Sequence, residues 1–166
     1  VGLPEFGEAA WAMEQLLNSW LAEQKPASAD LLQLAAEAMQ GHGRIDLATA
    51  CDMRYATIDA RFSVKEVDLA IVADVGTLQR LPRIIGEGLA RELAFTGRDF
   101  DGKEAHAMKL VNQVFTDKES LMTAVLKTAA EIASKSPLTI RGIKDTLNYS
   151  RDHSVAEGLS YVSAKN

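Results

Sequence analysis

The chain has 166 residues, which is within the range of one domain and long enough to bury a sizeable core. Hydrophobic residues make up 47% and charged residues 25%, an ordinary globular composition that excludes an intrinsically disordered chain. The net charge of -5 provides no basic footprint, so we do not expect nucleic acid as a partner.

Cysteine and histidine content narrows the classes of site. The single cysteine, Cys51, excludes an internal disulfide and a cysteine-rich metal site. His42, His106 and His153 show no ligand spacing, so we expect no metal. No apolar run reaches the roughly 18 residues that span a bilayer, and no charged-then-apolar leader opens the chain. These features predict a cytoplasmic protein with no membrane partner.

The opening third of the sequence predicts helices. Glu8–Gln24 has apolar residues near helical spacing, and Ser28 can N-cap a second helix that ends at Gly41. A third, short helix is expected over Ile45–Asp52. We therefore treat residues 1–40 as a helical N-terminal segment.

The middle of the chain changes character. Arg54–Thr57 and Arg61–Val64 are short and β-prone, so they are expected to form strands. Val67–Ala73 is apolar, and its periodicity does not decide between strand and loop. Asp74 is well suited to N-cap a helix, which Pro82 and a following glycine are expected to end.

Helices dominate the remainder, so the predicted fold is a single compact α+β domain that is predominantly helical. Two helix starts carry capping residues three apart, and Pro137 suits a first helical turn. The predicted elements are a helix over Glu87–Phe95, a helix begun by Asp101 and Glu104, a strand over Val111–Phe115, and helices over Lys118–Ser134, Leu138–Tyr149 and from Ser154 with Glu157.

Three acids stand out as candidates for chemistry: Asp46, Glu66 and Asp74. Glu66 and Asp74 flank the apolar stretch, and a carboxyl group packed against apolar neighbours favours its neutral form. Two such groups facing one substrate can remove a proton and return it elsewhere. From spacing alone, helix capping or a solvated charge is the favoured interpretation of these acids.

Specific motifs resemble one enzyme family. Asp46–Tyr55 resembles the glycine-loop helix and following strand of the crotonase (enoyl-CoA hydratase/isomerase) superfamily. Phe62–Asp68 followed by Ala73–Pro82 resembles its dienoyl-CoA isomerase branch, in which an acid stands eight residues after the catalytic glutamate. Tyr149–Val155 resembles the C-terminal helical region of the same branch. The resemblance makes residues 41–166 a crotonase-like core with C-terminal helices, the C-terminal half of that fold.

The resemblance implies a two-base isomerisation of 3,5-dienoyl-CoA to 2,4-dienoyl-CoA. The residues matching Glu66 and Asp74 shuttle protons at opposite ends of the diene, and Asp46 is a third acid in the pocket. Gly43 matches one of the backbone N–H donors to the thioester oxygen. The implied partners are an acyl-CoA substrate and further copies of the chain in a homo-oligomer. No cofactor is implied, since coenzyme A is part of the substrate.

The departures from the family fall near the site. Where crotonases carry a glycine triplet, this chain has His42-Gly43-Arg44, and nothing in residues 1–40 resembles the family's upstream segments. A natural short relative, a deletion product and an engineered chain are all compatible with this pattern. We expect the acids to be present but the oxyanion hole and CoA cleft to be incomplete, so that activity is impaired. The alternative is a catalytically inactive, truncated or engineered helical module that acts as a scaffold or self-associates.

Four arginines in the middle of the sequence, Arg80, Arg83, Arg91 and Arg98, have two interpretations. The favoured one is surface charge that keeps the protein soluble. The alternative is that some of them contact the phosphates of CoA.

Overall fold

The computed structural model describes residues 42–165. The helical segment predicted for residues 1–40 lies outside the described residues. In chain order the elements are β1 (His42–Arg44), α2 (Ile45–Ala50), β2 (Tyr55–Thr57), β3 (Arg61–Ser63), the 3-10 helix η2 (Lys65–Leu69), α3 (Thr77–Ile85), α4 (Glu87–Thr96), β4 (Phe100–Asp101), α5 (Gly102–Ala107), β5 (Gln113–Phe115), α6 (Lys118–Ala133), α7 (Pro137–Ser150) and α8 (Val155–Ser163).

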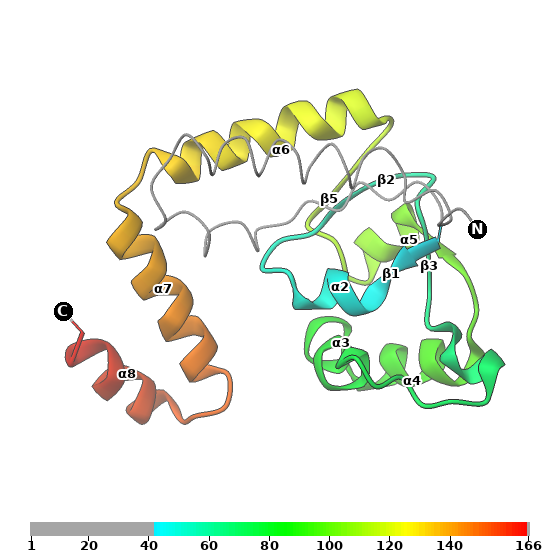
Figure 1. Cartoon of the computed structure of the whole chain (residues 1–166), viewed down its shortest axis with the longest axis horizontal. Helices are drawn as coiled ribbons and strands as arrows, with labels where there is room; N and C mark the ends of the chain where they lie inside the picture. Colours follow the sequence, from blue (N-terminus) through cyan, green and yellow to red (C-terminus); the bar gives the residue numbers. More distant parts are fainter. Residues whose placement is uncertain (1–41, 166) are drawn as a thin grey trace, which may run out of the picture.

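The described strands form two small sheets. β1 pairs in parallel with β3, so that Gly43 lies opposite Phe62, and β3 pairs antiparallel with β4. β2 and β5 form a parallel pair with Ala56 opposite Val114. Because parallel neighbours need a long crossover, the chain between β2 and β5 has room for α3, α4 and α5 (Figure 1). The predicted α+β class, predominantly helical with few short strands, is confirmed.

The hydrophobic core lies between these strands and α3, α4 and α5. Phe62 of β3 and Phe100 of β4 stack with ring centroids 5.5 Å apart. Leu81 of α3 and Leu93 of α4 are fully buried against the same cluster. A smaller cluster around Leu121 packs α6 onto the β2–β5 pair. Burial of this kind is the main stabilising contribution, and it holds the segments that carry the candidate acids.

Helix starts agree with several predictions. Asp101 N-caps α5 by accepting a hydrogen bond from the Glu104 N–H at 2.8 Å. Ser154 and Glu157 form the predicted reciprocal capping box at α8. Ser136 caps α7, with Pro137 in its first turn.

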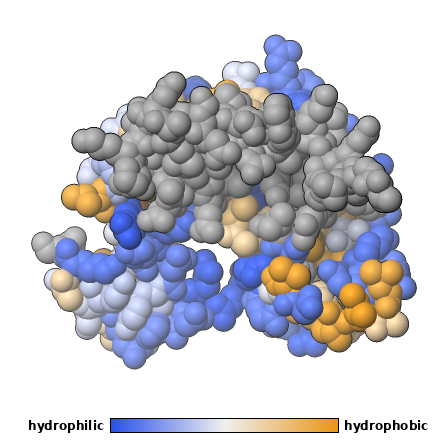
Figure 2. Space-filling view, in the orientation of Figure 1, coloured by the Kyte–Doolittle hydropathy of each residue, from blue (hydrophilic) through white to orange (hydrophobic). Residues whose placement is uncertain are grey.

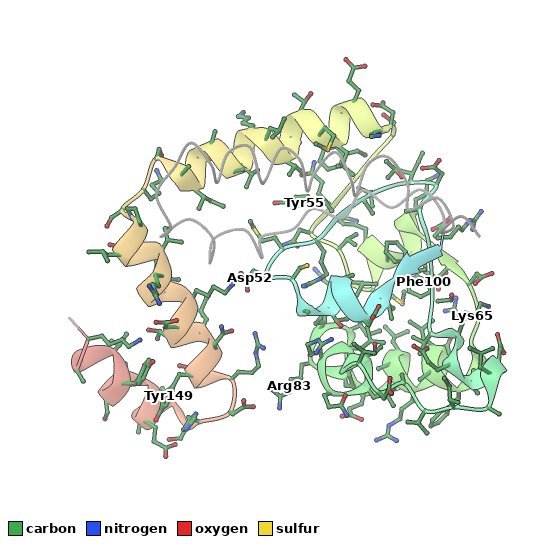
Figure 3. The ribbon with its side chains drawn as sticks, viewed as in Figure 1. Asp52, Tyr55, Lys65, Arg83, Phe100 and Tyr149 are labelled. Carbon is green, nitrogen blue, oxygen red and sulfur yellow. The ribbon has the colours of Figure 1, made fainter. Side chains whose placement is uncertain are left out.

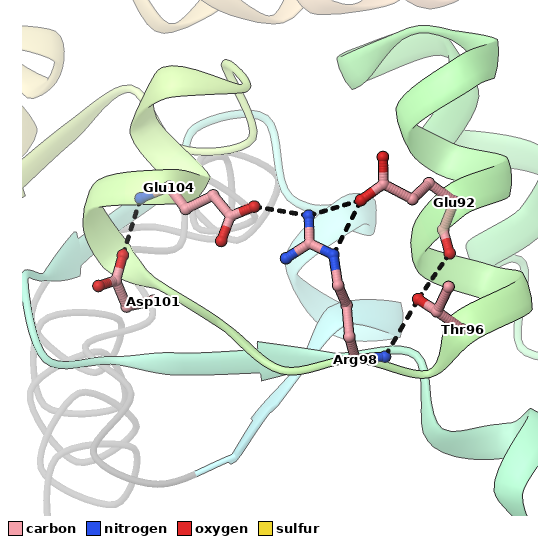
Figure 4. A network of polar contacts seen from close by, with 5 residues as sticks. All are labelled: Glu92, Thr96, Arg98, Asp101 and Glu104. Carbon is pink, nitrogen blue, oxygen red and sulfur yellow. Dashed lines mark hydrogen bonds and ion pairs between the residues drawn. The ribbon is translucent and has the colours of Figure 1, made fainter.

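Glu104 does not complete a capping box, because its carboxylate turns to Arg98 instead. The Arg98 guanidinium contacts Glu104 at 2.6 Å and Glu92 of α4 at 2.9 Å (Figure 4). The two carboxylates raise the pKa of Arg98, with the Glu104 hydrogen bond as the largest cause. This network fastens the end of α4 to the start of α5.

Two predictions about α3 are wrong. Asp74 is not its N-cap: that position is Gly76, whose φ of 89° is in the left-handed region, and no side chain caps the helix. Pro82 does not end the helix, which continues to Ile85, whereas the glycine predicted with it, Gly86, does end the helix. Proline lacks the N–H that would bond the carbonyl oxygen four residues before it, so Pro82 removes one hydrogen bond of the helix, and burial of Leu81 and Ile85 keeps this turn in place.

The sequence does not decide between strand and loop for Val67–Ala73, and the structure shows that the start of this segment is neither. Residues Lys65–Leu69 form the 3-10 helix η2, which ends where Ala70 adopts a left-handed φ of 55°. A loop then leads to Gly76 and α3.

The last two helices, α7 and α8, lie away from the core (Figure 1). α7 buries none of its residues fully, and α8 buries only Gly158. A ring stack joins the two helices, with Tyr149 and Tyr161 centroids 4.0 Å apart and His153 on the other side of Tyr149. None of the described helices is both long and apolar enough to cross a bilayer.

Candidate active site

Asp46 lies in the first turn of α2, where it is 9% exposed. The helix follows directly on β1, so Gly43 is three residues upstream in the strand that pairs with β3. The Thr49 hydroxyl donates to the Asp46 carbonyl oxygen at 3.0 Å. This bond ties the first and second turns of a helix of only six residues.

Glu66 and Asp74 lie on either side of one loop. Glu66 is half-buried in η2, and its carbonyl oxygen accepts a hydrogen bond from the Ile71 N–H at 3.1 Å. That bond and the left-handed Ala70 turn the chain sharply after η2. Asp74 is exposed, two residues before Gly76. The three candidate acids therefore come from three segments, α2, η2 and the loop before α3, and β2 and β3 lie between the first two.

Most of the apolar side chains between the two acids are exposed, whereas Ala73 is buried. Leu69 is 70% and Val72 75% exposed, so the packing expected around the acids is not found there. Figure 2 shows hydrophobic side chains gathered on this side of the molecule, around α4 and the segment before α3. The exposed apolar residues of this segment are Val67, Leu69, Ile71, Val72 and Val75.

Arg80 connects two of the acid-bearing segments. From the first turns of α3, its guanidinium donates to the Asp46 carbonyl oxygen at 2.8 Å and to the Thr49 hydroxyl at 3.2 Å. It also donates to the Val75 carbonyl oxygen at 2.8 Å, next to Asp74. One side chain thus contacts both α2 and the loop.

A pocket of about 480 Å³ lies beside this cluster, between α3 and α7. Two ion pairs bridge α7 and its following turn to the core, Lys144 to Asp52 and Arg83 to Asp152, each at 2.8 Å (Figure 3). The described residues that line the pocket are Thr49, Cys51, Asp52, Met53, Arg54, Arg80, Arg83, Ile84, Ile132, Ile140, Ile143, Lys144, Leu147, Asn148 and Arg151. Glu66 and Asp74 are outside that set, so the pocket is not the space between the two acids.

Arg54 forms part of the pocket wall and is fixed by backbone carbonyls. Its guanidinium donates to the Leu110 oxygen at 2.5 Å and to the Cys51 oxygen at 2.7 Å. Burial lowers the pKa of Arg54 from its ordinary value, and the nearby charges of Cys51 and Asp52 partly offset that effect. Within residues 42–165, no three His, Cys, Asp or Glu side chains gather in a group that would hold a metal ion.

Comparison with known proteins decides the family. The enoyl-CoA hydratase/isomerase family matches residues 31–163. The chain belongs to this family. The resemblance inferred from the motifs around Asp46, Glu66 and Asp74 is therefore confirmed.

Individual relatives agree with the dienoyl-CoA isomerase branch. The human mitochondrial delta(3,5)-delta(2,4)-dienoyl-CoA isomerase is 56% identical over 125 residues, which are 75% of this chain and 38% of that protein. The peroxisomal dienoyl-CoA isomerase of Arabidopsis thaliana is 54% identical over 124 residues, 75% of this chain and 45% of that protein. The chain thus spans less than half the length of these curated relatives.

Solved structures confirm the crotonase-like fold for most of the chain. The enoyl-CoA hydratase of Bacillus anthracis superposes with a TM-score of 0.69 at 34% identity, covering 73% of this chain and 46% of that one. The partial coverage agrees with the prediction that the chain holds the C-terminal half of the fold.

The predicted cytoplasmic location is contradicted by these relatives. The human enzyme is mitochondrial and the Arabidopsis enzyme is peroxisomal. Neither the single cysteine nor the lack of a charged-then-apolar leader distinguishes the cytoplasm from these organelles.

Sequence reasoning missed the role of Arg80, which it grouped with surface arginines. Nothing in the spacing of Arg80 and Asp46, 34 positions apart, indicates that they are in contact. The glycine at position 76 is the only local signal, because it leaves space beside the backbone for the guanidinium.

Proposed function

We propose that this protein isomerises 3,5-dienoyl-CoA to 2,4-dienoyl-CoA with Glu66 and Asp74 as the proton-shuttling pair. The supporting observation is the 56% identity to a dienoyl-CoA isomerase over 125 residues. Any stretch of 125 residues in a chain of 166 includes residues 42–125, so the match contains both acids.

The proposed reaction transfers a proton along the conjugated chain. One carboxylate of the pair removes a proton from C2, and the electrons of that C–H bond form the C2=C3 double bond. The C3=C4 electron pair moves to form the C4=C5 double bond, and the C5=C6 electron pair forms a new C–H bond at C6 with a proton from the other acid. Atoms and charge balance without an oxidant or a metal, since one proton leaves the substrate and one enters it.

Asp46 and Gly43 have supporting roles in this proposal. Negative charge develops on the thioester oxygen as the C2 proton leaves, and backbone N–H donors stabilise it. Gly43 is proposed as one donor, from the middle of β1 and two residues before α2. Asp46 is proposed as the third acid, buried at the start of that helix.

A turnover assay with a 3,5-dienoyl-CoA, followed by the absorbance of the conjugated product, tests the proposal. Glu66→Gln and Asp74→Asn are each expected to lower kcat by about 100-fold or more, because general acid–base groups contribute about that much. Asp68→Asn is the matched control, since Asp68 is an exposed acid in the same 3-10 helix as Glu66. If kcat in both acid variants equals that of the wild type, Glu66 and Asp74 do not transfer protons in the reaction. If the wild type itself shows no turnover, the inactive helical module is supported instead.

A further inference from the structure

Arg80 is the side chain that joins the segments of two candidate acids. Its bonds reach the Asp46 carbonyl oxygen at 2.8 Å, the Thr49 hydroxyl at 3.2 Å and the Val75 carbonyl oxygen at 2.8 Å. The first two acceptors belong to α2, and the third is the residue directly after Asp74. The Arg80 guanidinium therefore links α2 to the loop.

The path of the Arg80 side chain depends on Gly76. A Cβ at position 76 would collide with the guanidinium, and the φ of 89° there is one that other residues rarely adopt. Gly76 is also the N-cap of α3, and its carbonyl oxygen accepts a hydrogen bond from the Arg80 N–H at 3.1 Å. Gly76 and Arg80 thus form one unit in which the loop, the helix start and the guanidinium fit together.

The contacts require an arginine rather than a cation in general. The guanidinium is a planar fork with donors in fixed directions, so it can serve three oxygens on two segments at once. A lysine ammonium is a compact charge without this planar geometry, so it cannot bind the oxygens of both segments in the same way. All three acceptors are neutral oxygens, and none of the ion pairs among residues 42–165 includes Arg80. The group therefore acts here through directional hydrogen bonds.

We propose that Arg80 is the positioning residue that holds Asp74 in place relative to Asp46. Its contribution to turnover rests on the proposed isomerase function, but the positioning itself does not. Arg80 reaches both acids only through the backbone next to them, so it acts through their placement and not on the substrate. Misplacing a catalytic group by about 1 Å can lower a rate by about 100-fold.

Hydrogen exchange tests the positioning without any substrate. Exchange of peptides covering residues 45–51 and 70–77 is compared for the wild type, Arg80→Met, Arg80→Lys and Arg83→Met. Arg83 is the matched control, because it lies on the same helix and pairs with Asp152 instead. Both Arg80 variants are expected to exchange faster in these peptides, and Arg83→Met is expected to match the wild type. Unchanged exchange in Arg80→Met, equal acceleration in Arg83→Met, or full recovery in Arg80→Lys would each overturn the proposal.

Kinetics on the same variants test the consequence for catalysis. Arg80→Met is expected to lower kcat by about tenfold or more while KM changes little, since the acids and not the binding surface are displaced. Adding Asp74→Asn is expected to cost less in the Arg80→Met background than in the wild type, because the two changes affect one group. Wild-type kcat in Arg80→Met, or fully multiplicative losses, would contradict a positioning role. If the wild type has no turnover, the isomerase proposal fails, and hydrogen exchange alone then decides the positioning.

Discussion

Gly102 lies directly against the backbone carbonyl oxygen of Thr57, with no room between them for a side chain. Gly102 opens α5 and Thr57 ends β2, so this contact sets how closely the helix approaches the β2–β5 pair. Gly102 is buried, and a Cβ there would meet backbone atoms rather than a side chain that can move away.

Gly102→Ala is expected to destabilise the fold by about 1–3 kcal/mol, the usual cost of forcing a methyl group into a packed site. Thermal or urea unfolding measures the change. Gly88→Ala is the matched control, because a Cβ there meets open space in α4 and replaces a flexible glycine. That control is expected to be neutral or stabilising by about 0.5–1 kcal/mol. Equal stability of the two variants would mean that α5 can move away from Thr57 at little cost in free energy.

The stacked pair of Phe62 and Phe100 is expected to be a main determinant of core stability. Phe100 is 2% exposed, so Phe100→Ala is expected to cost about 3–5 kcal/mol and to lower the Tm strongly. Phe95→Ala removes the same side chain from α4, where it is 71% exposed, and is expected to change stability by less than about 0.5 kcal/mol. Similar losses of stability in both variants would show that the buried Phe100 stabilises the fold no more than the exposed Phe95 does.

Asp117 is expected to make α6 sensitive to acid. Its carboxylate N-caps the helix, accepting from the Ser120 N–H at 2.8 Å and from the Thr116 hydroxyl at 2.7 Å. These hydrogen bonds, with Ser120 first, lower the pKa of Asp117 from its ordinary 3.8. Because the folded-state pKa is the lower one, the stabilisation is complete above about pH 4 and is lost as the pH falls through the folded value.

Asp117→Asn keeps a good N-cap but removes the titration. The Tm difference between wild type and Asp117→Asn is expected to favour the wild type at pH 7 and to shrink steadily below pH 4. Asp59→Asn, in the turn between β2 and β3, controls for the change in net charge. A difference that stays constant from pH 7 to pH 3 would exclude a titrating cap.

The α7–α8 pair is expected to open more readily than the core. α7 has no fully buried residue, and its links to the core include the exposed pair of Arg83 with Asp152. Amide exchange is therefore expected to be faster in residues 137–163 than in 77–96, where Leu81 and Leu93 are fully buried. Raising the salt concentration should widen the gap by screening the ion pairs. Equal protection of both regions would show that α7 is held by packing that its exposure does not reveal.

Local sequence features were sufficient for most of the elements. The short strands around Tyr55 and Phe62, the capping box of Ser154 and the helix over Lys118–Ala133 follow from β-propensity, capping chemistry and apolar periodicity. These signals act within a few residues, so they are visible in the chain itself. At Pro82, the rule that proline ends a helix predicted the wrong boundary, because burial of the neighbouring side chains keeps α3 helical through this residue.

The sequence by itself determined the family and named Asp46, Glu66 and Asp74, because motifs are fixed by residue identity and spacing. Only the tertiary structure decided that Arg80 contacts both α2 and the loop, that Gly102 meets Thr57, and that the apolar residues around Leu69 are exposed. Contacts between distant segments depend on how the core brings those segments together, and neither periodicity nor propensity carries that information.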